Sequence, residues 1–272
     1  MTDRQDHPVH RIISEVVDTY LKAADTAAPG LIEGLYLEGS AALDDFRPHT
    51  SDIDFVAVTA EPLDASGLAA LARVHAGLPR RPHFDGVYLT WTDLARGPGP
   101  VPHAHEGRLH PAGPTAHNPI TWHTLARYGI ACRGPHPGTL AIWADPHALT
   151  SWTDGNLDTY WRPWLTRAAN LRSAFGLYTL TPAATVWVVT GVTRLHYTLA
   201  TLDITSKTDA AHYALTTFPT RWHRLLHETL RIRRRDPARP GYRSPFRRRR
   251  DALEFAALVI DDAHRLHSGR SG

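Results

Sequence analysis

The stretch LYLEGSAALDDFRPHTSDIDFVAV, residues 35–58, sets a glycine and a serine, Gly39 and Ser40, ahead of two aspartates, Asp52 and Asp54. The apolar runs at its two ends are typical of buried β-strands. Side chains alternate across a strand, so both aspartates are expected on one face, roughly 6.5–7 Å apart along the chain. Buried carboxylates are destabilising unless cations balance them. The stretch therefore predicts a site for divalent cations.

The donor atoms in this stretch indicate which metal ion and which kind of substrate would bind. Carboxylate oxygens without a nearby thiolate favour Mg²⁺ or Mn²⁺ over zinc, and Mg²⁺ held by few carboxylates usually completes its shell with substrate phosphates. Gly39 allows the backbone to approach a ligand, and Ser40 starts a short helix whose N–H groups and hydroxyl can bind an anion. We therefore expect a nucleoside triphosphate site with two Mg²⁺ ions and chemistry of displacement at phosphorus.

The composition excludes several other classes of protein. The chain has 272 residues, a hydrophobic fraction of 42%, a net charge of +3 and one cysteine, Cys132, so no intrachain disulfide can form. No apolar run is as long as a membrane span, and the N-terminal sequence does not have the pattern of a targeting segment. We expect a cytoplasmic protein with no membrane partner.

The hydrophobic pattern predicts a mixed first part and a helical second part. A helical stripe from Val9 to Leu21 precedes strands in GLYLE and IDFVAV, a helix from Leu68 to Leu78, and a strand in FDGVYLTW. Residues 95–118, which are rich in Gly, Pro and His, are predicted to form a surface loop. A helix should start at Pro119, and IACRG and LAIW should add edge strands. From residue 146 onward all predicted elements are helical.

Two motifs resemble a known family. The GS…DxD motif of residues 35–58 resembles the signature of the DNA polymerase beta-like nucleotidyltransferase superfamily. The wider chain resembles its streptomycin/spectinomycin (aminoglycoside) adenylyltransferase branch. The second motif, VTRLHYTLATLDITSKTDAAHYAL, is similar to the family's helix, turn and helix in which an arginine and a lysine hold the triphosphate; these match Arg194 and Lys207.

The resemblance implies a fold and an activity. The fold is α+β, with an N-terminal nucleotidyltransferase domain at residues 1–145, built on a small mixed sheet with flanking helices, and a C-terminal helical bundle at residues 146–272. The activity is Mg²⁺-dependent transfer of AMP from ATP, the co-substrate, to a hydroxyl of a small molecule. An aminoglycoside-like acceptor, and hence a role in antibiotic resistance, is the best single interpretation.

The family also needs a third carboxylate on the strand after the DxD strand, as base or as a further metal ligand. Asp85 in HFDGVYLTW is the candidate, although Gly86 could mark a bulge that turns it away, and Glu106 and Asp93 are alternatives. Ser51, next to the DxD motif, is assigned to nucleotide binding with Gly39 and Ser40.

The acceptor region departs from the family pattern. Relatives bind polycationic aminoglycosides through carboxylates near the start of the helix that carries the arginine, but the corresponding run, LTPAATVWVVTGV, contains no acid. Asp154, Asp158 and Glu106 are other sources of negative charge. Trp122, Trp152, Trp161, Trp164 and Trp187 could stack on a ligand, but such spacing is more often that of core residues.

Two further functions stay open. Ten arginines fall within residues 231–250, which could neutralise the phosphates of an RNA, so nucleotidyl transfer to RNA or protein is an alternative. A solvated basic segment is the preferred interpretation. A nucleotide-binding homologue without catalysis is the other alternative. Four histidines, His103, His105, His110 and His117, lack the spacing of a zinc site and are assigned to a solvated loop.

Overall fold

A computed structural model describes residues 8–113 and 118–270 of the chain. The chain divides into two compact units, Met1–Asp145 and Pro146–Gly272. The first unit contains a six-stranded mixed sheet with helices, and the elements described in the second are all helical, so the predicted α+β fold class is confirmed. Within the described ranges, no helix combines the length and apolar character needed to cross a membrane.

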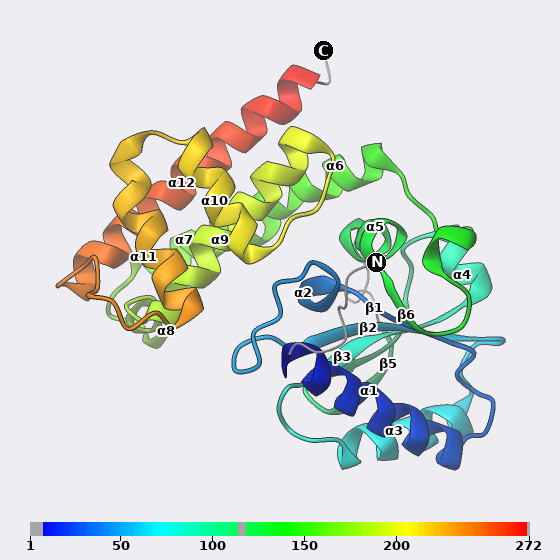
Figure 1. Cartoon of the computed structure of the whole chain (residues 1–272). Helices are drawn as coiled ribbons and strands as arrows, with labels where there is room; N and C mark the ends of the chain where they lie inside the picture. The colour runs from blue at the N-terminus through cyan, green and yellow to red at the C-terminus, as the bar shows by residue number, and fades with distance from the viewer. Residues whose placement is uncertain (1–7, 114–117, 271–272) are drawn as a thin grey trace. The chain divides into compact units, whose positions relative to one another are not determined.

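The first unit is a sheet covered by helices on both faces (Figure 1). The strands lie in the order β5-β4-β3-β2-β1-β6, and of these neighbours only β2 and β3 run parallel. The strands are β1 (Gly34–Leu37), β2 (Ile53–Thr59), β3 (Phe84–Thr90), β4 (Val101–His105), β5 (Arg108–Gly113) and β6 (Ile130–Arg133). The helices are α1 (Pro8–Ala27), α2 (Gly39–Ala42), α3 (Ala65–Gly77), α4 (Trp91–Arg96) and α5 (Pro119–Tyr128), with a short η1 (Pro137–Thr139).

Side chains that alternate along the strands form two apolar layers, one on each face of the sheet. Leu35 and Phe55 belong to the layer that contains the buried stripe of α1, which includes Tyr20. Tyr36 and Val56, their neighbours in sequence, belong to the opposite layer, with residues of α4 and α5. Because successive side chains on a strand point to opposite faces, strands this apolar need helices on both sides.

The predicted loop at residues 95–118 was wrong for most of its length. Val101–His105 and Arg108–Gly113 pair as an antiparallel hairpin that extends the sheet beyond β3. Its turn is formed by Glu106 and Gly107, whose φ angles of +50° and +75° are both left-handed. Two left-handed residues match the twist of a two-residue hairpin, but glutamate at the first position is a weak turn signal. The predicted strand in LAIW is also absent, and Leu140, Ile142 and Trp143 instead pack against the sheet as irregular chain.

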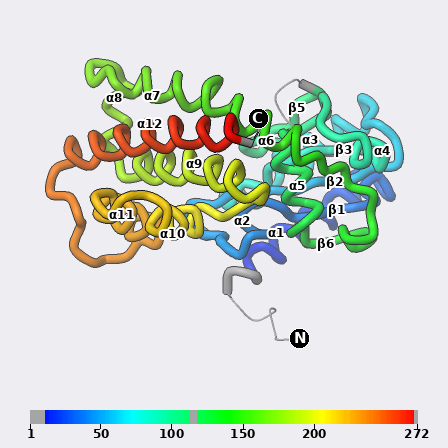
Figure 2. The backbone as a smooth tube through the Cα atoms, turned by 90° about the horizontal axis from the view of Figure 1, so that it is seen from above, coloured from blue at the N-terminus to red at the C-terminus, as the bar shows by residue number. Residues whose placement is uncertain are grey.

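In the second unit, α9 (Pro182–Thr201) packs against α6, α10, α11 and α12. Figure 2 shows the long α12 running beside α9. Gly191 of α9 lets the Trp161 ring approach the helix, where a Cβ would collide with that ring. The other elements are α6 (Pro146–Asn156), η2 (Leu157–Trp161), α7 (Arg162–Ala169), α8 (Ala174–Tyr178), α10 (Lys207–Thr217), η3 (Thr220–Trp222), α11 (His223–Arg234) and α12 (Pro245–Arg270).

Candidate active site

Four carboxylates gather where β1 ends and where β2 and β3 begin. Asp54 and Asp85 are direct partners in the parallel register of β2 and β3. Asp52 precedes β2, and Glu38 follows β1, which runs antiparallel to β2. These four residues, Glu38, Asp52, Asp54 and Asp85, are called the carboxylate edge below. The sheet topology therefore brings together the three aspartates that the sequence predicted as site residues.

The Gly-Ser turn lies directly against Asp54. Gly39 has a φ of +58°, and a Cβ there would collide with the Asp54 carboxylate. The backbone N–H of Glu38 donates to the Asp54 carbonyl at 2.9 Å, which ties the turn to the start of β2. The Ser40 hydroxyl lies 3.5 Å from the Asp52 carbonyl. Glycine is thus required at position 39 both by the backbone angle and by the closeness of the carboxylate.

Asp85 is held by two donors from the β4–β5 hairpin. Nδ1 of His105 is 3.0 Å from its Oδ2, and the backbone N–H of Glu106 donates to its Oδ1 at 2.9 Å. Burial raises the pKa of Asp85, and the negative charge of Asp52 acts in the same direction, while the two donors oppose the shift. Gly86 does not interrupt the pairing of β2 with β3, and its lack of a side chain makes room for Phe55, whose carbonyl a Cβ would meet.

Glu38 was missed by the sequence analysis. Its Oε1 accepts a hydrogen bond from the Thr121 hydroxyl at 3.1 Å, and burial together with the charge of Asp54 raises the pKa of Glu38 to about 8. A signal was present, because the acid stands at the end of a buried strand directly before the Gly-Ser pair. That position predicts a carboxylate close to Asp52 and Asp54.

The chemistry of the carboxylate edge fits a divalent cation. All its side-chain donors are hard oxygens, and Glu38 and Asp85 each have a pKa raised in part by a neighbouring carboxylate. Arg81 is a partner for Asp52, with Nη1 3.4 Å from Oδ1, but both side chains are exposed and such a pair is weak. Within residues 8–113 and 118–270, no three His, Cys, Asp or Glu side chains already stand at metal-binding distance. The fit therefore rests on the oxygen donors and on the closeness of their negative charges.

Several other sequence candidates have structural partners. Asp93, an alternative base, forms the capping box of α4, where its Oδ2 accepts from the Thr90 N–H at 3.0 Å. Ser51 is buried, and its hydroxyl accepts from the Arg47 N–H at 3.0 Å within its own loop. Glu106, the other alternative base, reaches Asp85 through its backbone. These contacts favour Asp85 over Asp93 as the third carboxylate.

The histidines of the hairpin divide into two groups. His103 on β4 and His110 on β5 stack on each other, with ring centroids 4.9 Å apart. His105 instead contacts Asp85. His117 lies outside the described residues. His103, His105 and His110 thus lie on a sheet-edge hairpin rather than on the expected loop, and among the described residues they are not part of a metal-binding group.

In the second unit, Arg194 lies in α9 and Lys207 is the first residue of α10. The hydroxyl of Ser206 caps α10 by accepting from the Asp209 N–H at 3.0 Å, which agrees with the helix start expected there. The Lys207 ammonium lies 5.5 Å from the centroid of the Trp187 ring. Because α9 and α10 pack together, the two basic side chains predicted to hold the triphosphate belong to one pair of helices.

Two of the three acids considered for the acceptor, Asp154 and Asp158, contact basic side chains. Oδ1 of Asp154 is 2.7 Å from Nδ1 of His264, and Oδ1 of Asp158 accepts from Nε of Arg162 at 2.7 Å. Arg162 also donates to Asp261 at 3.0 Å. The negative charge of Asp158 is therefore partly neutralised by its own helical neighbourhood.

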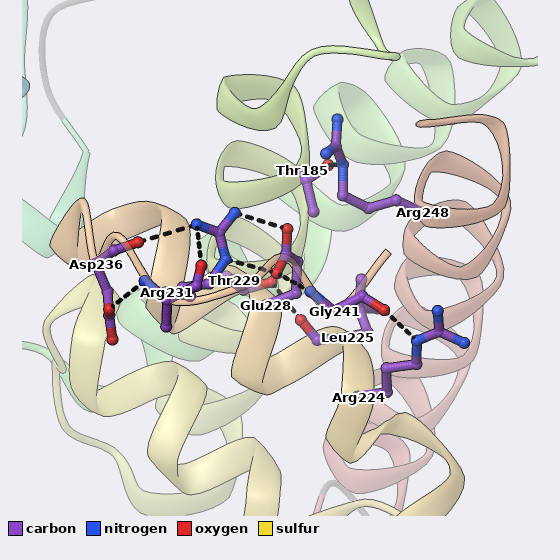
Figure 3. A network of polar contacts seen from close by, with 10 residues as sticks. Thr185, Arg224, Leu225, Glu228, Thr229, Arg231, Asp236, Gly241 and Arg248 are labelled. Atoms are coloured by element: carbon purple, nitrogen blue, oxygen red, sulfur yellow. Dashed lines mark hydrogen bonds and ion pairs between the residues drawn. The ribbon is translucent and has the colours of Figure 1, made fainter. Parts of the chain in front are cut away.

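Much of the arginine-rich segment has internal partners. Arg231 donates to both oxygens of Glu228, at 2.8 and 2.9 Å, and to the Asp236 carbonyl at 3.0 Å (Figure 3). Arg248 is buried and donates to the Thr185 hydroxyl at 3.1 Å. Arg224, just before the segment, donates to the Gly241 carbonyl at 2.8 Å, and Arg249 donates to the Thr179 hydroxyl at 2.8 Å. Arg224, Arg231, Arg248 and Arg249, with Glu228, are called the arginine network below.

Comparisons with known proteins found one family match and similar solved structures. The model of the aminoglycoside adenylyltransferase C-terminal domain family matches residues 160–245, a range that includes both Arg194 and Lys207. Among solved structures, the spectinomycin adenyltransferase AAD(9) from Enterococcus faecialis, crystallised with ATP and spectinomycin, matches with a TM-score of 0.61 and 12% sequence identity. The match covers 91% of this chain and 99% of that chain. No curated protein matches the chain by sequence.

The second unit thus resembles the C-terminal domain of aminoglycoside adenylyltransferases, and the chain as a whole has a fold similar to that of AAD(9). The resemblance predicted from the two motifs is thereby confirmed. The likeness to AAD(9) concerns the fold, since its sequence identity is low.

Proposed function

We propose that this chain transfers AMP from ATP to a hydroxyl group of a small molecule, with an aminoglycoside-like compound as the acceptor. The observation that carries the proposal is the meeting of Asp52, Asp54 and Asp85 at one edge of the sheet, against the Gly39 turn. A negatively charged edge of this kind would repel a triphosphate unless cations intervene. The family match of the second unit supports the same activity.

In this proposal Asp52 and Asp54 hold Mg²⁺, with Asp85 able to add a further oxygen. The bound cation supplies charge neutralisation at the phosphates and orientation of the attacked phosphorus. In the same proposal, the backbone N–H groups of the Gly39 turn and the Ser40 hydroxyl hold the distal phosphates, and Ser51 supports the loop. Arg194 and Lys207 contribute positive charge toward the pyrophosphate that leaves.

Asp85 takes the proton of the attacking hydroxyl. A carboxylate with a raised pKa is better matched to this task near neutral pH than an ordinary one. The oxygen–phosphorus bond forms as the bond to pyrophosphate breaks, and the proton passes to the Asp85 carboxylate. Charge-assisted hydrogen bonds from basic side chains stabilise the departing anion.

The test follows the α-phosphate of labelled ATP, with Mg²⁺ present, into a panel of aminoglycosides and other polyhydroxylated compounds. The proposal predicts label on a small molecule, lost in Asp52→Asn and retained in Asp44→Asn. Asp44 is a matched control, because it is exposed in the same stretch and its left-handed φ of +54° is also compatible with asparagine. Transfer by Asp52→Asn at the wild-type rate would overturn the proposal.

The same experiment separates the alternatives. Label on RNA or protein would favour a macromolecular acceptor, for which the pairing of Arg231, Arg248 and Arg249 within the second unit offers no support. ATP binding without transfer to any acceptor in the panel would favour a nucleotide-binding homologue.

A further inference from the structure

The Asp85 carboxylate is engaged at both oxygens by consecutive residues of one hairpin. His105 approaches Oδ2 through Nδ1 at 3.0 Å, and the Glu106 N–H donates to Oδ1 at 2.9 Å. An aspartate side chain turns about two bonds, and contacts at both oxygens fix both rotations. The position of this carboxylate is thus set from outside its own strand.

The backbone of the hairpin delivers these two donors. Ala104 pairs with Gly86 in the antiparallel register of β3 and β4, so His105 comes beside Asp85. The chain then reverses through Glu106 and Gly107 in left-handed conformations, which aims the Glu106 N–H at the carboxylate. The unusual turn conformation at Glu106 therefore has a consequence for the site. It shapes the end of the hairpin that contacts Asp85.

The two contacts differ in how they can be altered. The Glu106 N–H belongs to the backbone and is present with any residue other than proline at position 106. The His105 contact depends on the side chain, which is otherwise 65% exposed to solvent and makes little use of its apolar surface. The main contact of the His105 side chain is therefore its hydrogen bond to the Asp85 carboxylate, and it contributes little to the packing of the sheet.

We propose that His105 is a positioning residue for nucleotidyl transfer, which fixes the Asp85 carboxylate in the orientation that receives the proton of the acceptor hydroxyl. The inference rests on the proposed function and deepens it. Catalysis depends steeply on placement, and an error of about 1 Å can cost on the order of a hundredfold in rate. Loss of His105 should act on the chemical step rather than on the binding of ATP.

A first test compares steady-state transfer in variants of the hairpin histidines. His105→Ala should lower kcat about ten- to a hundredfold, with KM for ATP changed less than about twofold, as for other residues that orient a site. His105→Asn retains a side-chain N–H donor and should recover most of the loss. His103→Ala and His110→Ala are matched controls, because those rings stack on each other, and both should keep kcat within about twofold of wild type.

A second test does not depend on activity. Because the Asp85 carboxylate can only accept at Oδ2 when ionised, a neutral His105 must carry its proton on Nδ1. Nitrogen NMR of the histidine rings should show the Nδ1–H tautomer for His105, and Asp85→Ala should remove that signature. An Nε2–H tautomer in wild type, or one unaffected by Asp85→Ala, would contradict the contact.

The outcomes separate this inference from the function on which it rests. If wild-type protein shows no transfer, the proposed function fails, while the tautomer still tests the contact. If wild type transfers AMP and His105→Ala keeps its kcat, the positioning role fails alone. A tenfold loss in His105→Ala that His105→Asn does not recover, with folding intact, would also contradict positioning through the donated hydrogen bond.

Discussion

At the carboxylate edge of the first unit acids lie beside acids, whereas in the arginine network of the second unit each guanidinium meets an acceptor. Glu38 has a pKa raised to about 8 by burial and by Asp54. Glu228, whose side chain is fully buried, has a pKa held below its usual range despite burial, because Arg231 and the Gly241 N–H donate to it. A buried acid that meets a basic partner stabilises the fold, whereas several acids that meet at one sheet edge form a candidate site for a cation.

The largest expected effect is at the carboxylate edge. Asp54→Asn should reduce nucleotidyl transfer by at least about a thousandfold, since the proposed site would lose one of its cation ligands. The same change removes a negative charge beside Glu38, so the free energy of unfolding without metal should rise or stay unchanged. Initial rates and urea unfolding in EDTA measure the two effects. If the variant were both inactive and less stable, Asp54 would instead be a residue that stabilises the fold.

The arginine network should respond in the opposite way. Glu228→Ala removes the buried carboxylate that accepts from the half-buried Arg231 guanidinium and from the Gly241 N–H, and should lower the free energy of unfolding by about 1–3 kcal/mol. Glu254→Ala is the control, because Glu254 is 59% exposed and its contact with Arg250 is 3.8 Å, and it should change stability by less than about 0.5 kcal/mol. Urea unfolding compares them. Equal losses would remove the distinction between buried and exposed pairs.

The raised pKa of Glu38 predicts that the stability of the folded chain depends on pH. The folded chain keeps a proton on Glu38 up to about pH 8, whereas the unfolded chain loses it near the ordinary pKa of 4.5. Stability in EDTA should therefore fall as pH rises between these values, by at most about 1.4 kcal/mol per pH unit from this group. Glu38→Gln should flatten that slope in unfolding curves measured from pH 5 to 8. An identical slope in the two proteins would show that the pKa of Glu38 is not raised in the folded chain.

The smallest effect concerns Asp93. Asp93→Ala removes the capping box of α4 and should cost about 1 kcal/mol of stability, with transfer unchanged at a temperature where the protein is folded. Thermal unfolding and initial rates provide the check. A large loss of transfer without loss of stability would instead make Asp93 part of the chemistry.

The first unit was predictable where local patterns agreed with tertiary contacts. The strands around Phe55 and Val87, and the helix between Asn118 and Gly129, follow from apolar runs and end signals that the structure uses directly. The Gly-Ser turn and the two aspartates were found together because they lie on consecutive elements. The contact of Asp54 with Gly39 and the pairing of Asp54 with Asp85 depend on the way neighbouring elements meet in the sheet.

The hairpin and its contact with Asp85 could not be predicted in the same way. Residues 101–113 carry polar and proline residues in place of a clear alternation, and the turn at Glu106 needs a left-handed glutamate. The contact of His105 with Asp85 depends on the register in which β4 pairs with β3. The sequence pattern of residues 101–105 does not show that register. Likewise, the arginines of residues 231–250 suggested an external polyanion because sequence does not show that Glu228 and backbone carbonyls face them.

The central claim is that the carboxylate edge binds ATP only through a divalent cation. Calorimetric titration of ATP into the protein, in Mg²⁺ and then in EDTA, tests it most directly, with Asp54→Asn and Asp44→Asn as a matched pair. Binding should occur in Mg²⁺ for wild type and Asp44→Asn, and should weaken at least about tenfold in EDTA and in Asp54→Asn. Equal affinity of all three proteins for ATP, in Mg²⁺ and in EDTA alike, would contradict the account.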